Sequence, residues 1–113
     1  MDRRTFTLSL GIGAAALMAP SVVLAAEDHL AEAISHTKEA IDHGKQGHAD
    51  VLVTHAEAAL QHATAAEQEK DNPHTKQGIM HLNAAIDTGK QGDAKAATGH
   101  AVEALKHLEA ATK

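Results

Sequence analysis

The chain has 113 residues, room for one domain, and carries ten histidines, no cysteine and a single aromatic side chain, Phe6. Without an aromatic residue after Phe6 it lacks a stacking platform for bases and the lining of a large organic-ligand pocket, and without cysteine it has no disulfide. Its net charge of -5 with neutral histidine disfavours nucleic acid and anionic lipid as partners and attracts cations.

Residues 1–25 have the pattern of a cleaved signal peptide. Arg3 and Arg4 give a basic start, residues 8–24 carry no charge and are largely apolar, and Ala25 ends a small-residue cleavage pattern. The apolar stretch is too short and too rich in glycine for a comfortable membrane helix. We therefore expect residues 26–113 to be exported to the periplasm, where no membrane contact follows removal of the leader.

Two details of the leader stay open. The Arg3-Arg4-Thr5-Phe6 segment matches the twin-arginine signal only in part, so the general secretory route is an alternative. Cleavage after Ala26 is an alternative to cleavage after Ala25, and it would place His29 third in the mature chain. A third-position histidine with the free amino group can hold Cu(II) in a square plane of nitrogens.

The mature region is an internal duplication. Residues 29–68 and 74–113 align without a gap, and eighteen of the forty positions are identical. Each repeat unit is predicted to fold as two helices around a Gly-Lys-Gln-Gly turn, at 44–47 in the first unit and 89–92 in the second. Alanine, leucine, glutamate and lysine dominate the flanks, and all four are good helix formers.

The sequence predicts four helices, at about 28–43, 48–67, 73–88 and 93–111. Gly44 and Gly89 are expected to end the first and third helices as left-handed C-terminal caps. Asn72 and Pro73 between the repeats offer an N-cap and a first-turn proline.

One heptad frame fits all four helices. Position g is small or aliphatic throughout, as in Leu52, and positions a and d carry residues such as Ile34 and Ile41 at a and Leu82 and Leu108 at d. Such a stripe is typical of a helix bundle. The fold class expected is therefore all-α, an antiparallel four-helix bundle made of two tandem helical hairpins, with a thin, alanine-rich core. We expect a monomer.

All ten histidines fall at position c of this frame, about 100° around the helix from the centre of the apolar stripe and so on the rim of the bundle. They are His29, His36, His43, His48, His55, His62, His74, His81, His100 and His107. Duplication explains part of this order but not the spacing of seven within each helix. Imidazole is the commonest metal ligand in proteins, so we interpret the whole set as candidate metal ligands.

Spacing limits how these histidines bind an ion. Residues seven apart lie about 10.5 Å apart along a helix, too far to share one metal. Carboxylates stand close enough to assist, namely Glu32 and Glu39 near His36, and Glu103 between His100 and His107.

Across each predicted hairpin, histidines are also expected at matching levels. The pairs 29/62, 36/55 and 43/48 have residue numbers that sum to 91, and 74/107 and 81/100 sum to 181. The level of Thr88 and Asp93 lacks histidine. Whether the histidines bind as pairs or singly is left open by the sequence.

The combined pattern resembles the small metal-binding protein family of periplasmic, histidine-rich bundles. The resemblance lies in His-Ala-x-x-Ala-Leu-x-His at 55–62 and 100–107, in Gly-Lys-Gln-Gly-His at 44–48, and in Gly-Ile-Met-His-Leu at 78–82. It implies a four-helix bundle that takes up several divalent ions, copper favoured, for scavenging, storage or homeostasis. Thr88 and Asp93 stand where the first repeat has His43 and His48, so this level lacks the histidines of the family pattern.

No enzyme is expected. The Glu-x-x-His motif of di-iron bundles and the His-Glu-x-x-His motif of zinc hydrolases are both absent. Imidazole with carboxylate suits Cu(II) best, with Zn(II), Ni(II) or Co(II) as further ions. The alternative is a periplasmic helical interaction or chaperone protein whose surface histidines sense pH. The sequence identifies no protein partner for metal delivery.

Overall fold

The computed structural model describes residues 28–113, so the predicted signal peptide lies outside the described part. Four helices make up this part: α2 (His29–Lys45), α3 (Ala49–Glu69), α4 (Pro73–Lys90) and α5 (Ala94–Ala111). Each begins and ends within two residues of its predicted bounds. None of the four combines the length and apolar content that crossing a membrane requires.

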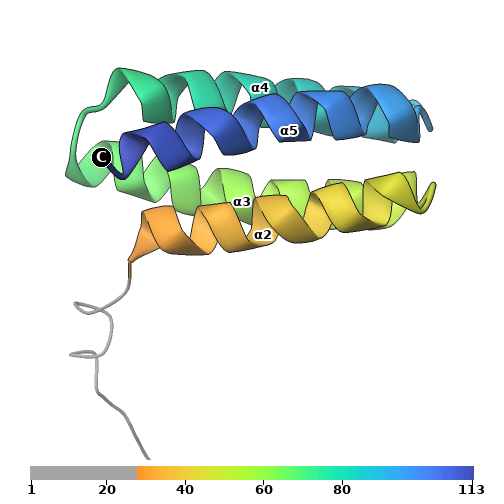
Figure 1. The fold of residues 1–113 in the computed structure, drawn as a ribbon, viewed down its shortest axis with the longest axis horizontal. Coiled ribbons are helices and arrows are strands. Elements are labelled where there is room, and N and C mark those ends of the chain that lie inside the picture. Colours follow the sequence, from red (N-terminus) through yellow and green to blue (C-terminus); the bar gives the residue numbers. More distant parts are fainter. Residues whose placement is uncertain (1–27) are drawn as a thin grey trace, which may run out of the picture.

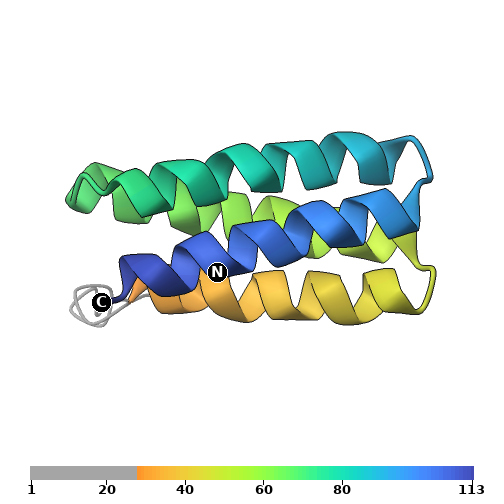
Figure 2. The same cartoon turned by 45° about the horizontal axis from the view of Figure 1, so that its top comes forward.

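The helices form a four-helix bundle in which successive helices run in opposite directions (Figure 1). Helices α2 and α3 form one hairpin, and α4 and α5 form the other. The hairpins meet where α2 packs against α5 and where α3 packs against α4. Figure 2 shows the four helices lying side by side along one common direction. The predicted bundle of two hairpins is confirmed.

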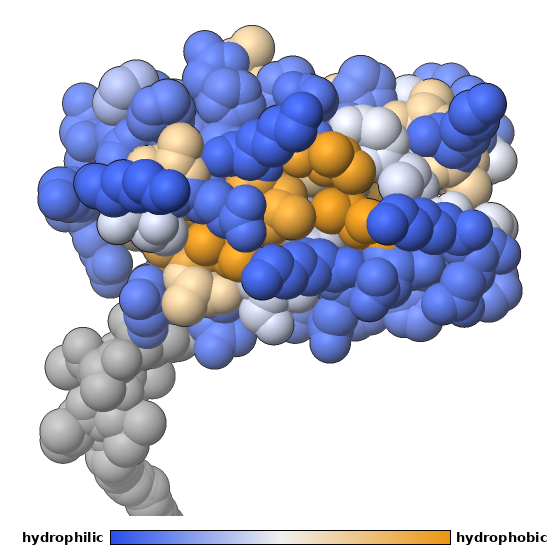
Figure 3. Space-filling model, in the orientation of Figure 1, coloured by the Kyte–Doolittle hydropathy of each residue, from blue (hydrophilic) through white to orange (hydrophobic). Residues whose placement is uncertain are grey.

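The core follows the predicted heptad stripe, with its centre shifted. Every buried apolar side chain occupies position a, d or g. Those at d and g are fully buried, whereas Ile41, Val53 and Ile86 at a are 7–9% exposed and Ile34 and other a residues are only partly buried. Figure 3 shows apolar side chains reaching the surface over the seam between α2 and α5. The core is therefore centred between positions d and g. Position a lies at one edge of this buried face, and position c, with the histidines, lies at the other edge.

The prediction that Gly44 and Gly89 are left-handed caps is wrong. Both glycines are buried inside helices that continue to Lys45 and Lys90. The residues with positive φ are Gly47 and Gly92, both at 84°. The amide of Gly47 donates to the Gly44 carbonyl at 3.0 Å, and the following amide donates to the His43 carbonyl at 2.9 Å. This is the hydrogen-bond pattern of a Schellman motif with Gly47 just beyond the cap.

The buried glycines serve the contact between the hairpins instead. A methyl group at Gly44 would collide with Leu52 Cδ1 at 2.7 Å and with the hydroxyl of Thr98 on α5. At Gly89 it would collide with Val53 Cγ2 on α3 at 2.5 Å. Since Gly89 and Thr98 stand 45 residues after Gly44 and Val53, these two contacts are equivalent in the two repeats. The missing side chains allow the hairpins to approach closely.

The loop between the repeats is fixed by its side chains. Asn72 Oδ1 accepts from the His74 amide at 2.8 Å, and Pro73 begins α4, as predicted. Lys76 pairs with Asp71 and, at 3.0 Å, with Glu67 at the end of α3. Hydrogen bonding with Glu67 and Lys76 lowers the pKa of Asp71, and the bonds to Asp71 and Glu67 raise the pKa of Lys76.

Candidate metal centre

The histidines form two columns, one along each hairpin. The first column runs along α2 and α3 and holds His29, His36, His43, His48, His55 and His62, and the second runs along α4 and α5 and holds His74, His81, His100 and His107. Most of these rings are partly buried, as in His29, His36 and His55, whose side chains are 23–29% exposed. Ions from solvent can therefore reach the columns.

Level pairs occur in both hairpins, as the spacing predicts. His29 and His62 have ring centroids 5.3 Å apart, with their Nδ1 atoms at 3.1 Å. The centroids of the other level pairs, 36/55, 43/48 and 74/107, lie 5.9, 6.2 and 5.8 Å apart. The ring planes within these four pairs are inclined to each other by 27–34°. The predicted pair 81/100 is not among the ring contacts of the described residues.

A second kind of ring contact joins histidines at successive levels, diagonally across the hairpin. The residue-number sums did not predict it. The diagonal pairs are 36/62, 43/55 and 81/107, with centroids 5.7, 5.3 and 5.4 Å apart. Their planes are almost parallel, at 7°, 4° and 6°. The first column is therefore a continuous zigzag of its six rings, and in the second column His74, His107 and His81 continue in the same way.

Side-chain direction explains the diagonals. The Cα–Cβ bond of a helical residue tilts toward the N-terminus of its own helix. In an antiparallel hairpin, His36 thus leans toward the level of His62, and His62 leans toward the level of His36. The level partner His55 leans the other way, toward His43. The same rule places Glu69 diagonally from His29, and their Oε2 and Nε2 atoms are 3.9 Å apart.

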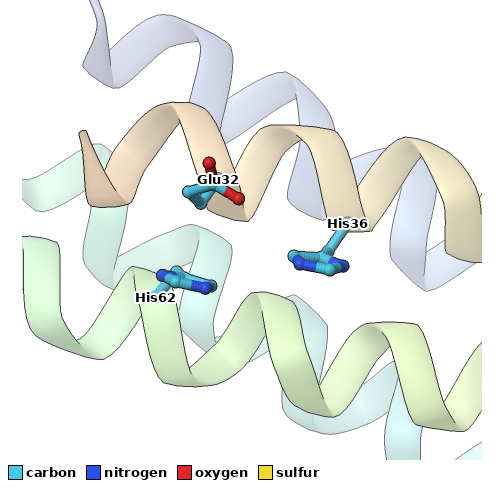
Figure 4. Close-up of side chains that lie close together, drawn as sticks. All are labelled: Glu32, His36 and His62. Atoms are coloured by element: carbon cyan, nitrogen blue, oxygen red, sulfur yellow. The ribbon is translucent and has the colours of Figure 1, made fainter. Parts of the chain in front are cut away.

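Three groups of side chains could each hold a metal ion, because in each group one ligand atom per residue lies within 4.8 Å of the others. They are Glu32/His36/His62, His36/Glu39/His55 and His81/Glu103/His107. In the first group, Glu32 and His36 on α2 and His62 on α3 point toward the same space between the helices (Figure 4). Each group combines two imidazoles from different helices with one carboxylate.

Glu39 illustrates how a carboxylate joins the two helices. Its Oε1 atom lies 3.1 Å from Nδ1 of His55 on α3 and 3.6 Å from Nδ1 of His36 on its own helix. The sequence placed Glu39 beside His36 by helical spacing, and the structure adds the contact with His55 on α3. Glu103 on α5 likewise lies close to His81 on α4. The sequence placed Glu103 between His100 and His107 and did not indicate this proximity to His81.

Two buried ring nitrogens fit a role in metal binding. Nδ1 of His36 and Nδ1 of His43 are buried and make no hydrogen bond among the described residues. A buried polar atom without a partner is costly, and a metal ion would satisfy the lone pair of a neutral imidazole. Imidazole and carboxylate are ordinary ligands for Cu, Zn and Ni, so the donor set fits a divalent transition metal.

The two columns differ in their carboxylates. Gln77 and Ala84 occupy the places in the second repeat that Glu32 and Glu39 occupy in the first. Glu103 instead supplies the carboxylate from α5, at the place that Ala58 occupies in the first repeat. Consequently the same diagonal histidine pair receives its carboxylate from opposite helices in the two hairpins.

Five histidines lie outside these groups. His29, His43, His48 and His74 extend the columns through ring contacts. His100 has no ring contact within residues 28–113, and its diagonal position is held by Thr88, whose hydroxyl donates to the Ala84 carbonyl at 2.9 Å.

The comparison with protein families agrees with this geometry. The sequence pattern of the family described as small metal-binding protein matches residues 5–111, which include all four helices. A comparison with curated proteins gives no significant match. The chain belongs to the small metal-binding protein family.

Proposed function

We propose that this protein binds several divalent transition-metal ions along its two histidine columns, with Cu(II) favoured. The main support is the three groups in which ligand atoms of two imidazoles from different helices and of one carboxylate lie within 4.8 Å of one another. Membership of the family supports the binding of metal itself. The groups lie on the outer flanks of the hairpins and offer donors without an enclosed pocket, which suits uptake and release better than catalysis.

The preference for Cu(II) rests on donor chemistry. For a given set of nitrogen and oxygen donors, affinity among the first-row divalent ions is highest for copper, so Zn(II), Ni(II) and Co(II) should bind more weakly. Cysteine is absent from the sequence. Met80, the one thioether outside the predicted leader, is 63% exposed on α4. The donors therefore favour Cu(II) over Cu(I), which prefers sulfur.

The proposed location is the periplasm, on the strength of the leader pattern in residues 1–25. An exported acidic bundle with many exchangeable sites would scavenge or store copper there and would contribute to metal homeostasis. Intact mass of the secreted protein tests this location. A mass beginning at Ala26 supports cleavage after Ala25, whereas a mass that retains the leader contradicts export with cleavage.

Titration of the metal-free protein with Cu(II), followed by native mass spectrometry, tests the binding proposal. The expected result is discrete copper adducts at neutral pH that disappear at pH 5, because protons compete for the imidazoles. The control is a variant in which His36, His55, His62, His81 and His107 are all replaced by alanine. Equal copper retention by this variant and the natural protein would reject the proposal.

A further inference from the structure

We propose that the two candidate groups of the first hairpin are alternative positions for one ion, with His36 as the ligand common to both. This inference rests on the proposed function and adds that the two groups are never occupied by metal at the same time. Glu32/His36/His62 uses the diagonal pair of the column, and His36/Glu39/His55 uses the level pair. The two groups therefore meet at a single imidazole.

The chemistry of that imidazole makes the positions exclusive. A neutral imidazole has one nitrogen with a lone pair and one nitrogen that carries a proton. It can therefore ligate one metal ion at a time. To bind two ions at once, His36 would have to lose its remaining ring proton and become a bridging imidazolate.

The surroundings of His36 keep both positions within reach of its ring. The ring stacks with both His62 and His55, with centroids 5.7 Å and 5.9 Å apart, so both neighbours lie beside it. Its Nδ1 atom lies 3.6 Å from Glu39 and makes no hydrogen bond in the described part of the chain. An ion held by His36 can thus exchange His62 and Glu32 for His55 and Glu39 without leaving the hairpin.

The second hairpin has no such alternative. Ala84 stands where the first repeat has Glu39, and a single group, His81/Glu103/His107, is formed there. Three groups with one shared ligand therefore predict two ions in three-ligand sites, one in each hairpin. The ion of the first hairpin has two positions and the ion of the second hairpin has one.

Copper counting in carboxylate variants of the full chain tests this. A Glu103→Gln background removes the group of the second hairpin, and the copper that the protein retains after gel filtration is then counted by native mass spectrometry. For ions in three-ligand sites, the shared-ligand proposal predicts one ion in this background, one ion after adding either Glu32→Gln or Glu39→Gln, and none after adding both. Adding His36→Ala alone should also remove the ion. His48→Ala, the same change at a histidine outside the three groups, serves as the control and should leave one.

Other outcomes have distinct meanings. Two ions in the background, falling to one with either carboxylate variant, would overturn the proposal in favour of independent sites. Two ions with loss of the Cu(II) electron paramagnetic resonance signal would indicate an imidazolate bridge and would also overturn it. Complete loss with Glu32→Gln alone or with Glu39→Gln alone would show a single fixed position, again against the proposal. Absence of copper from the natural protein would instead reject the proposed function. Circular dichroism on each variant separates loss of ligand from loss of fold.

Discussion

His36 on α2 stacks on His62 on α3 with ring planes 7° apart and centroids 5.7 Å apart, although the two residues belong to different levels of the hairpin. The opposite lean of side chains on antiparallel helices brings them together. This diagonal contact turns evenly spaced histidines into a continuous column, and it places a pair of imidazoles beside Glu32.

Copper should stabilise the fold. The candidate groups take their ligands from two helices, so they exist only when the hairpin is folded, and an ion that binds them shifts the equilibrium toward the native state. At a hundredfold excess of Cu(II) over the dissociation constant, each site should add about 2.7 kcal/mol to the free energy of unfolding. Thermal unfolding followed by circular dichroism should show a higher Tm with copper at pH 7.5 and no gain at pH 5. An unchanged Tm at pH 7.5 would speak against sites formed by folding.

The sequence predicted the helices and the core well because both depend on local and periodic signals. Alanine-rich segments with aliphatic residues at a, d and g have few alternatives to packing that stripe inward. The buried set accordingly contains Leu52, Leu82 and Leu108 at the expected positions. The position of the histidines on the flank followed from the same frame.

The sequence predicted neither which glycine caps each helix nor the diagonal histidine contacts. Both depend on tertiary structure, which residue spacing does not report. In Gly-Lys-Gln-Gly, either glycine can follow a helix. The choice of Gly47 over Gly44 depends on the close approach of α5 at Thr98, which is a tertiary contact. Residue-number sums report the level of each Cα atom, whereas the contact between His43 and His55 depends on the direction in which each side chain leaves its helix.

Substitutions of three glycines by alanine should have three different effects. Gly44→Ala would force a methyl group against Leu52 and Thr98, and overpacking of this kind costs about 1–3 kcal/mol. Gly47→Ala meets no neighbouring atom but places alanine at φ 84°, at a cost of about 1–2 kcal/mol. Gly99→Ala, in α5 with open space around it, should stabilise by about 0.5–1 kcal/mol. Urea unfolding measures all three, and a stable Gly44→Ala variant would contradict the close-approach role.

The ion pairs of Lys76 with Asp71 and Glu67 should make the stability of the fold depend on pH. Because the pKa of Asp71 is lowered in the folded protein, its contribution to stability is present above the ordinary value of 3.8 and is lost as pH falls through the folded pKa. Lys76→Gln removes the pairs with Asp71 and Glu67. Its Tm should therefore lie below that of the natural protein at pH 7, and the difference should shrink below pH 3.8. Lys95→Gln, at an exposed lysine of α5, is the matched control. A Tm difference that persists unchanged in acid would contradict the ion-pair explanation.

A carboxylate at residue 84 should restore copper binding to a disabled second hairpin. Glu103→Gln removes the one three-ligand group there, leaving His81 and His100 without the carboxylate that Glu39 provides at the equivalent place of the first hairpin. Adding Ala84→Glu puts an acid one helical turn from His81, facing the level of His100, as Glu39 faces His55 at 3.1 Å.

The natural protein should retain two copper ions in its three-ligand sites, the Glu103→Gln variant one, and the Glu103→Gln/Ala84→Glu variant two. Native mass spectrometry after gel filtration gives these counts. The control is Glu103→Gln/Asn83→Glu, which adds the same charge one residue earlier, about 100° around α4 and away from the histidines. If both double variants regain an ion equally, the gain comes from net charge and the geometric role of Glu39 is contradicted. If only the residue 84 variant regains it, the carboxylate beside the level pair is what completes a site in this fold.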